Sequence, residues 1–401
     1  MARFETAVVG GGLAGFIAAL AMGRAGRSVA LIAPEPDKTD HRTTALMDQS
    51  VRFMERLGLW ERVSPDAAAL STMQIIDGTA RLIRAPAARF RSSDIGIPAF
   101  GYNFANRSLL GALLDAVVAE PNITLFPSAV ENVALLSDCI TLSLSDGETV
   151  DADFVIGADG RKSRMREAAG IGIRTWAYPQ TAVVLNFAHS LPHGNTSTEF
   201  HTETGPFTQV PLPGNRSSLV WVVRPEQAER LLALPPEALG EKIEARMQSM
   251  LGKVTVEDGV QTWPLSSLVA DRFGKGRIAL IGEAAHAFPP IGAQGLNLSL
   301  RDIITLTEIL GTVRERPVPA DAGDRFDRRR RMDVLSRTYS VDLLNRSLLS
   351  GFLPVQMVRA AGLHLISGFA PLRNLLMREG VEPGRGLRAL PRILKDAVSR
   401  R

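Results

Sequence analysis

A glycine-rich turn near the start of the chain constrains the fold more than any other feature. An apolar, β-branched run at residues 4–9 leads into Gly-x-Gly-x-x-Gly at residues 10–15. A small-residue helical stretch to residue 25 and a second apolar run at residues 28–32 follow. Strand, turn, helix and strand in this order form a unit of about 30 residues. The sequence therefore predicts an α/β protein that begins with a β-α-β unit.

The three glycines of this turn have separate roles in holding phosphate groups. Gly10 allows the tight turn, Gly12 lets backbone approach a pyrophosphate, and Gly15 lets the helix pack on the strand. We interpret the turn as a dinucleotide site; a glycine-rich turn in an ordinary parallel-sheet protein is the alternative. The acidic residue expected after the second strand, which holds the adenosine ribose, is replaced by Ala33, and Glu35 lies two residues later. Ribose recognition therefore departs from the common pattern.

Composition and length limit the remaining choices. The 401 residues are 45% hydrophobic and 22% charged with a formal net charge of +4. This balance is typical of a globular protein and excludes disordered, collagen-like and coiled-coil chains, and the length predicts two domains. Cys139 is the single cysteine, so an internal disulfide and a thiolate zinc site are excluded, and we expect a reducing cytoplasmic location.

The distribution of charge bears on membranes and partners. The longest uncharged run near the start, at residues 7–23, is shorter than the roughly 20 residues of a membrane span, and we expect no targeting segment. Basic residues gather at residues 328–331 and again from Arg385 onward. Such clusters are either solvated helix faces or contacts for anionic lipid, nucleic acid or an acidic partner. Because no zinc-finger or RNA-binding motif accompanies them, we predict no nucleic-acid partner.

The middle of the chain changes in character. Residues 176–263 contain alternating strands separated by proline and glycine turns, with one helical pattern over residues 236–251. Residues 74–99 have the pattern of short strands and turns. These patterns predict an inserted antiparallel sheet with a helix. From residue 302 onward the chain is predicted to be mostly helical.

Three separated segments then resemble one family. They are the glycine motif at residues 10–15, Gly-Ala-Asp-Gly at residues 157–160, and Gly-Glu-Ala-Ala-His at residues 282–286, followed by Gln-Gly-Leu-Asn at residues 294–297. In this order and at these intervals they resemble the FAD-dependent aromatic hydroxylases, the class A flavoprotein monooxygenases, over nearly the whole chain. Asp-x-Arg-x-x-Ala-Leu at residues 40–46 is most similar to the hydroxylases of ubiquinone biosynthesis within that family.

The resemblance implies an α/β fold with interleaved domains. We expect a Rossmann-like FAD-binding domain of the p-hydroxybenzoate hydroxylase type, an inserted antiparallel-sheet substrate domain and a helical C-terminus. The expected ranges are residues 1–73, 100–175 and 264–325 for the FAD-binding domain, 74–99 and 176–263 for the substrate domain, and 326–401 for the helical C-terminal region.

The resemblance also implies which residues contact FAD. Arg42 and Arg107 match positions that line the flavin and its pyrophosphate, where a cation with several donors suits a dianionic group; a surface ion pair is the alternative for either. Independently of the resemblance, the residues Asn106, Arg107 and Ser108 are expected to cap the following helix. Asp159 matches an aspartate near the pyrophosphate that acts through water, a ribose hydroxyl or backbone N–H groups, and the backbone of Val130 meets the adenine. The implied cofactor-binding residues are Gly10, Gly12, Gly15, Arg42, Arg107, Val130, Asp159, Gly282, Glu283, Gly295, Leu296 and Asn297.

The later segments would meet the flavin itself. Glu283 stands where the family usually has an aspartate that accepts a hydrogen bond from the ribityl chain, and its extra methylene moves that acceptor. Gly295, Leu296 and Asn297 would present a helix N-terminus to the pyrimidine end of the isoalloxazine, where backbone donors favour the anionic reduced flavin. His286 matches a structural turn, so we favour packing and hydrogen bonding over acid–base work. No catalytic residue is assigned, and no metal site is predicted.

The implied chemistry belongs mainly to the cofactor. A transiently bound NAD(P)H, or a ferredoxin, would reduce FAD, and the flavin C4a-hydroperoxide formed with O2 would transfer an oxygen atom to an electron-rich ring. The protein orients the reactants and excludes water. The main hypothesis is hydroxylation of a polyprenylated ubiquinone precursor.

Two alternatives stay open. One is a same-fold flavoenzyme with another substrate, either a soluble phenol hydroxylase or a prenyl-lipid reductase. The other is a flavin-binding subunit of a quinone-biosynthesis complex without turnover. For a membrane-soluble substrate, residues 351–369 and the basic tail either lie on the inner membrane or pack on the flavin domain. We therefore expect a cytoplasmic protein with peripheral contact to the membrane or to that complex.

Overall fold

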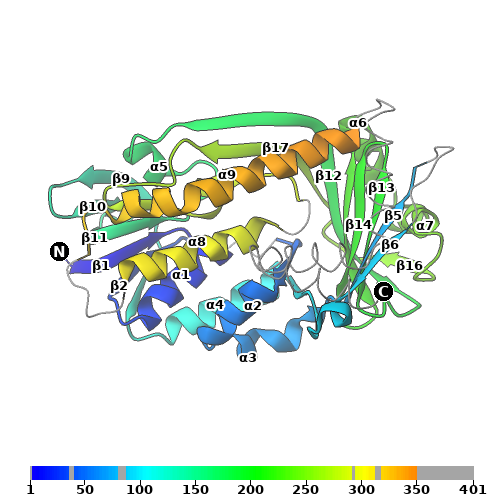
Figure 1. Ribbon diagram of the computed structural model, residues 1–401, viewed down its shortest axis with the longest axis horizontal. Helices are drawn as coiled ribbons and strands as arrows, with labels where there is room; N and C mark the ends of the chain where they lie inside the picture. The colour runs from blue at the N-terminus through cyan, green and yellow to red at the C-terminus, as the bar shows by residue number, and fades with distance from the viewer. Residues whose placement is uncertain (1, 36–39, 80–86, 291–293, 312–317, 350–401) are drawn as a thin grey trace, which may run out of the picture.

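The computed structural model describes residues 2–35, 40–79, 87–290, 294–311 and 318–349. Within these residues the strands form three sheets, of eight, nine and three strands. Figure 1 shows the eight-stranded sheet at the left with helices beneath it and the nine-stranded sheet at the right. Two long strands and one long helix connect the two sides.

The eight-stranded sheet contains the predicted β-α-β unit. Its strands are β1 (Ala2–Val9), β2 (Val29–Ile32), β8 (Ile123–Phe126), β9 (Val130–Leu135), β10 (Ile140–Leu144), β11 (Thr149–Gly157), β18 (Gly274–Lys275) and β19 (Ile278–Leu280). β1 pairs in parallel with β2 and β11, and β11 pairs in parallel with β19. The path is β18-β19-β11-β1-β2-β8, with β10 and β9 as an antiparallel extension from β11. The parallel core confirms the predicted α/β class.

Helices beside this sheet complete its core. They are α1 (Leu13–Arg24), α2 (Asp48–Arg56), α3 (Trp60–Val63), α4 (Asn106–Val118), α5 (Arg164–Ala168) and α8 (Gln294–Leu310), with the short 3₁₀ helices η1 (Ser64–Asp66) and η3 (Gly282–Ala284). The third short helix, η2 (Ser92–Ile95), instead contacts β6 (Ala88–Arg91) of the nine-stranded sheet. Every residue of α1 from Gly15 to Gly23 is buried, because the helix lies against β1 and β2 and also contacts α4 and α8. Burial on all sides explains why this segment has no polar face.

The nine-stranded sheet joins two distant parts of the chain. Its strands are β5 (Thr72–Asp77), β6 (Ala88–Arg91), β12 (Ile173–His189), β13 (Thr196–Thr202), β14 (Gly205–Leu212), β15 (Arg216–Val223), β16 (Val254–Val256), β17 (Gln261–Ala270) and β20 (His286–Ala287). The path is β20-β17-β12-β15-β14-β13-β5-β6, and β16 pairs with β12. β5 and β6 therefore add an early segment to the edge of a sheet built mainly from residues 173–270.

Two helices lie on this sheet where the sequence predicts one. α6 (Pro225–Leu232) precedes α7 (Pro236–Arg246), and both begin with proline in the first turn. Proline fits the first turn of a helix but cannot continue one, so Pro235 and Pro236 end one helix and start another. α7 also ends earlier than the predicted residue 251, because Gln248 and Ser249 adopt positive φ angles of 55° and 53°.

The two faces of the nine-stranded sheet have different neighbours. Trp221 of β15 belongs to an apolar cluster with α6 and α7. Because side chains alternate along a strand, Ser218 and Val222 lie on the opposite face. There Ser218 Oγ accepts a hydrogen bond from Thr43 Oγ1 at 2.9 Å. This opposite face is therefore directed toward the segment around Thr43.

The three-stranded sheet has no counterpart among the elements predicted from the sequence. It consists of β3 (Thr43–Met47), β7 (Gly101–Ala105) and β4 (Ala68–Ala69), with β7 in the middle. A Cβ atom at Gly101 would lie 2.3 Å from the carbonyl oxygen of Leu46, so this position requires glycine. The pairing joins segments that are remote in sequence, which local residue patterns cannot reveal.

Helix α9 (Ala322–Leu349) spans the molecule from the first sheet toward the second (Figure 1). Near its start Asp327 Oδ1 accepts a hydrogen bond from the backbone N–H of Phe273 at 2.9 Å. Farther along, Asp342 Oδ1 accepts from Trp176 Nε1 at 3.0 Å and from the Tyr178 hydroxyl at 2.6 Å, both on β12. Residues 350–401, including the 351–369 segment and the basic tail, lie outside the described residues.

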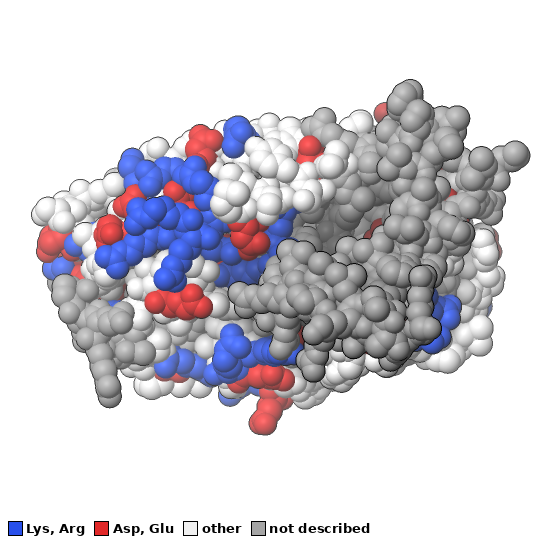
Figure 2. Space-filling model, in the orientation of Figure 1, with Lys and Arg blue, Asp and Glu red and all other residues white. Residues whose placement is uncertain are grey.

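The arginine cluster at residues 328–331 lies on α9. Figure 2 shows Lys and Arg side chains gathered there with acidic side chains among them. Arg331 pairs with Asp327 at 2.6 Å and Arg329 with Glu308 at 3.3 Å, so part of the cluster forms ion pairs on the protein surface. None of the helices in the described ranges has the length and apolar character needed to cross a bilayer.

Candidate functional site

Parallel pairing brings three predicted segments to one edge of the eight-stranded sheet. Val9, at the end of β1, lies beside Gly157 at the end of β11, and Gly157 lies beside Leu280 of β19. The segments at 10–15 and 158–160 therefore leave the sheet side by side, next to the segment that begins at Gly282. In α/β proteins this carboxyl edge of the strands is where ligands bind.

The glycine turn is held by two close backbone contacts. Gly10 has a φ angle of +129°, and a Cβ atom there would lie 2.2 Å from the Ala158 carbonyl oxygen. A Cβ atom at Gly15 would lie 2.0 Å from the Gly10 carbonyl oxygen. Both positions therefore exclude any side chain, for the reasons expected from the motif.

Gly12 has the opposite surroundings. It is exposed, and a Cβ atom there would meet no atom within 4 Å. It is the N-cap residue of α1, where no side chain caps the helix and no acidic residue occupies the first turn. The first N–H groups of α1 are thus available to an anion, which suits a pyrophosphate. Ala33 is buried and Glu35 is exposed beyond β2.

The two carboxylate oxygens of Asp159 differ in their hydrogen bonding. Its Oδ2 accepts a hydrogen bond from the Met165 N–H at 3.1 Å, whereas its buried Oδ1 has no partner among the described residues. A lone buried acceptor next to the turn fits a cofactor hydroxyl group. The neighbouring Arg166 is buried and donates to the Ala284 carbonyl oxygen at 2.9 Å, which ties the 158–166 segment to η3.

Glu283 forms an ion pair with Arg161. Its Oε2 lies 3.2 Å from Arg161 Nε, and Arg161 also donates to Ser266 Oγ at 2.7 Å. The Glu283 side chain is exposed, so this contact is weak in energy. Arg161 is absent from the predicted site residues, because its two partners are more than 100 positions away and no local pattern marks such a pair.

Arg42 is held by an acidic and an aromatic neighbour. Its Nε and Nη2 donate to the two oxygens of Asp40 at 2.8 and 2.9 Å, and its guanidinium lies 4.9 Å from the ring centre of Trp263. Burial by itself would raise the pKa of Asp40, but hydrogen bonds from Arg42 and Asn106 outweigh it and lower that pKa. The ion pair considered for Arg42 is thus present.

The prediction that Asn106 caps the following helix is wrong. It is the first residue of α4 rather than its cap, and the structure shows no side-chain cap at the preceding Ala105. Its Nδ2 instead donates to Asp40 at 3.0 Å, and its Oδ1 accepts from Thr44 Oγ1 at 2.6 Å. Arg107 is exposed and makes no polar side-chain contact with the described part of the chain.

The start of α8 is anchored by the side chain of Asn297. Its Oδ1 accepts from the Met47 N–H at 2.8 Å and from Ser50 Oγ at 2.6 Å, and its Nδ2 donates to the Ala45 carbonyl oxygen at 2.7 Å. This side chain therefore joins α8 to β3 and α2, which leaves only the Asn297 backbone to a cofactor. Gly295 is exposed, and a Cβ atom added there would meet no described atom within 4 Å, whereas Leu296 packs partly against the core.

Val130 is the first residue of β9 and is buried. Its strand contacts α5, which follows Asp159 and Gly160. Gly282 begins η3 with a φ angle of +58°. The predicted residues at 10–15, 159 and 282–283 follow strands that end at the carboxyl edge. The side chains of Arg42, Asp159, Glu283 and Asn297 contact residues outside the predicted set, and Arg107 makes no polar side-chain contact with the described part of the chain.

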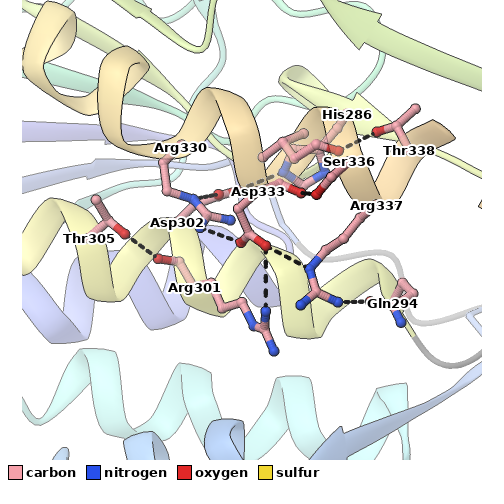
Figure 3. A network of polar contacts seen from close by, with 11 residues as sticks. His286, Gln294, Arg301, Asp302, Thr305, Arg330, Asp333, Ser336, Arg337 and Thr338 are labelled. Carbon is pink, nitrogen blue, oxygen red and sulfur yellow. Dashed lines mark hydrogen bonds and ion pairs between the residues drawn. The ribbon is translucent and has the colours of Figure 1, made fainter. Parts of the chain in front are cut away.

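Figure 3 shows a polar network beside this edge that links β20, α8 and α9. His286 Nε2 lies 2.7 Å from Asp302 Oδ2, and Arg330 Nε donates to Asp302 Oδ1 at 2.8 Å. Arg330 and Arg337 donate to Asp333 at 2.6 and 2.8 Å. The buried, hydrogen-bonded His286 has the packing surroundings expected for it.

Acid is expected to weaken this network. Burial by itself raises the pKa of Asp333, but Arg330 and Arg337 outweigh it and lower that pKa. The contribution of Asp333 to the free energy of unfolding is therefore complete above about pH 4 and lost as the pH falls through its lower folded-state pKa. The free energy of unfolding, measured with urea between about pH 2 and 6, should depend less on pH in Asp333→Asn than in the wild type. The substitution of an exposed carboxylate, Asp94→Asn, is the control and should not reduce this pH dependence. If the free energy of unfolding varied with pH equally in the wild type and both variants, the stabilising role of Asp333 would be contradicted.

Other concave regions lie away from this edge. One groove of about 580 Å³ runs between α6 and the paired strands β12 and β17, and another of about 440 Å³ is lined by residues 135–140, 168–170 and 275–278. Among the described residues no three His, Cys, Asp or Glu side chains are grouped to hold a metal ion.

The parallel sheet edge, the uncapped α1 and the added sheet, which is antiparallel except where β5 pairs with β13, define a dinucleotide-binding α/β protein with a second sheet beside its cofactor edge. The chain belongs to the family described as "FAD binding domain", which it matches over residues 3–332, and it is an FAD-dependent monooxygenase of the aromatic-hydroxylase group. The residues present fit FAD, since Gly12 and the start of α1 leave room for its pyrophosphate.

Individual relatives agree with this assignment. The ubiquinone hydroxylase UbiL of Rhodospirillum rubrum is 34% identical over 96% of this chain and 93% of its own length. The 3-demethoxyubiquinol 3-hydroxylase of Escherichia coli is 30% identical over 90% of this chain and 93% of its own length. The crystal structure of p-nitrophenol 4-monooxygenase PnpA from Pseudomonas putida shares the fold, with a TM-score of 0.78, 20% identity and coverage of 96% and 99% of the two chains.

Proposed function

We propose that the protein hydroxylates an aromatic ring of a polyprenylated ubiquinone precursor, with O2 as oxidant and NAD(P)H or a ferredoxin as electron donor. The observation that carries the proposal is the similarity to two ubiquinone-pathway hydroxylases over at least 90% of this chain. Bound FAD supplies the redox chemistry and activates O2 for transfer to the ring.

The residues of the chain bind and orient that cofactor. The first N–H groups of α1 hold the pyrophosphate, and Gly12 leaves room for it. Asp159 Oδ1, a buried acceptor without a partner among the described residues, would accept a hydrogen bond from a hydroxyl group of the cofactor. The backbone at the start of α8 would face the pyrimidine end of the flavin, and Asn297 holds this helix against β3 and α2.

The substrate faces the nine-stranded sheet. The face of this sheet directed toward Thr43 carries an apolar cluster of Tyr178, Ala182, Val184, Val222 and Leu265. These residues are buried, and the Tyr178 hydroxyl donates to Asp342 of α9. Apolar surroundings of this kind suit an aromatic ring with a prenyl chain and exclude water from the reacting atoms. We propose the sheet of residues 173–270 with β5 and β6 as the substrate domain. No side chain is assigned as a catalytic base.

The proposal is tested with the full-length protein carrying FAD. We expect NAD(P)H oxidation to rise when a polyprenylated phenol is added, and the product to gain one oxygen atom from ¹⁸O2, measured by mass spectrometry. A strain that lacks the gene should accumulate an under-hydroxylated quinone precursor. We also expect the protein to sediment with lipid vesicles that contain the substrate.

Other outcomes identify the alternatives. Hydroxylation of small phenols only, with normal ubiquinone in the deletion strain, would overturn the ubiquinone assignment and indicate a soluble phenol hydroxylase. Reduction of a prenyl lipid without oxygen incorporation would indicate a reductase. Bound FAD without turnover, together with loss of ubiquinone in the deletion strain, would indicate a subunit of a quinone-biosynthesis complex.

A further inference from the structure

Asp302 is a buried carboxylate that no cofactor contact accounts for. It lies on α8, farther along the helix than Asn297, with 1% of its side chain exposed. Both of its oxygens accept a short hydrogen bond, Oδ2 from His286 at 2.7 Å and Oδ1 from Arg330 at 2.8 Å (Figure 3). A buried carboxylate is costly unless it is paired and hydrogen-bonded, and Asp302 is both.

This carboxylate determines the state of the His286 ring. An ionised carboxylate only accepts hydrogen bonds, so Nε2 of His286 carries a proton. The ring also stacks on Phe288, with centroids 6.0 Å apart and planes 15° apart, and meets Phe273 edge-on at 6.4 Å. Two aromatic rings and one charged hydrogen bond leave His286 a single orientation.

His286 is fixed to the segment predicted to meet the flavin. It follows Gly282 and Glu283 in the same short loop, and its strand β20 pairs with β17 through Val269. Asp302 therefore connects the 282–287 loop to α8, whose start is predicted to meet the other end of the flavin. One carboxylate thus sets the spacing between two cofactor-facing segments.

Arg330 brings α9 into the same arrangement. Its side chain is 7% exposed, and besides Asp302 it binds Asp333 at 2.6 Å on its own helix. The guanidinium thereby neutralises Asp302 through the oxygen that His286 does not use. Without it, the carboxylate would be left buried beside a histidine that supplies only one hydrogen bond.

We propose that Asp302 is a positioning residue for FAD, which acts through His286 on the 282–287 loop and is kept in place by Arg330. The inference rests on the proposed placement of FAD along this edge, but not on the identity of the substrate. Asp302 itself does not touch the cofactor.

The test uses Asp302→Asn in the full-length protein. We expect the Kd for FAD to rise about tenfold or more, because the amide has one acceptor oxygen where the carboxylate has two, so either a buried donor is left unsatisfied or the His286 ring must adopt its other tautomer. The flavin reduction potential should shift as well. A purely electrostatic role predicts the opposite change in affinity, since loss of one negative charge favours an anionic cofactor. Unchanged or tighter FAD binding therefore overturns the proposal.

A double-mutant cycle tests the route through His286. If Asp302 acts through that ring, His286→Gln weakens FAD binding and the double variant binds FAD no more weakly than the worse single variant. If the Kd of the double variant rose by the product of the two single increases, Asp302 and His286 would act independently, and the proposal would be contradicted. Arg330→Lys keeps the charge and should retain most of the affinity, whereas Arg330→Met should lose it.

A matched control separates positioning from general stability. Glu5 of β1 forms a comparable ion pair with the fully buried Arg27 at 2.9 Å, away from the strand end that leads into Gly10. Glu5→Gln should lower the Tm and leave the Kd for FAD unchanged. If Asp302→Asn lowers the Tm like Glu5→Gln and leaves FAD affinity and potential unchanged, its role is structural only and the proposal is wrong. These measurements need no substrate, so they stand even if the hydroxylation proposal fails.

Discussion

Replacement of Gly15 by alanine should abolish FAD binding and strongly destabilise the folded protein. The added Cβ atom would lie 2.0 Å from the Gly10 carbonyl oxygen, so backbone must move on one side or the other. Neither side moves freely, because Gly10 N–H is bonded to the Ile32 carbonyl oxygen at 2.9 Å and α1 is buried along most of its length. Overpacking of this kind costs about 1–3 kcal/mol or more.

Thermal unfolding and flavin content of the purified variant measure this effect. Gly111→Ala is the matched control, since Gly111 lies inside α4 with no atom within 4 Å of an added Cβ. That substitution should leave flavin binding intact and stabilise the helix by about 0.5–1 kcal/mol. A Gly15→Ala protein that purifies with a full complement of FAD and an unchanged Tm would contradict the close packing of the turn.

Gly12→Val should have the second largest effect, and we expect that effect mainly on the affinity for FAD. Gly12 has φ and ψ angles of −86° and 175°, which any residue adopts, and no atom lies within 4 Å of an added Cβ. The fold should therefore persist. The valine side chain would occupy the space in which a pyrophosphate meets the first N–H groups of α1, and we expect the Kd for FAD to rise at least about 100-fold.

The two effects are separated by measuring the Tm of the apoprotein and its increase with added FAD. A ligand that binds only the folded form raises the apparent stability, so the wild type should gain stability with FAD and Gly12→Val should not. The apoprotein Tm of Gly12→Val should fall by only about 1–4 °C, because valine is a poorer N-cap residue than glycine. Wild-type FAD affinity in Gly12→Val would show that the pyrophosphate does not lie at the start of α1.

The elements that could be predicted well from the sequence depend on local patterns. β1, α1 and β2 follow from a β-branched run, spaced glycines and a second apolar run within 32 residues. The positions of Gly10 and Gly15 could be predicted as well, because the motif implies the close contacts that the structure shows. The three-stranded sheet could not, since its strands pair residues 43–47 with residues 101–105.

The same distinction holds within the site. The motif predicts that Asn297 meets the cofactor through the backbone at the start of α8. Its side chain contacts Met47, Ser50 and Ala45, which only the packing of α8 on β3 and α2 determines. The pairing of Glu283 with Arg161 is likewise a contact between remote segments. A motif identifies a position along the chain, whereas the partner of its side chain depends on which elements are neighbours in space.

The α/β class, the glycine turn and the order of the three motif segments can be predicted from the residues alone, because they depend on short-range spacing and on the side chains that a tight turn excludes. Only the packed structure shows that Asp302 lies between His286 and Arg330, because β20, α8 and α9 must pack together before these three side chains come into contact. A buried carboxylate is stable only when all of its partners are in place, and no local pattern records that condition.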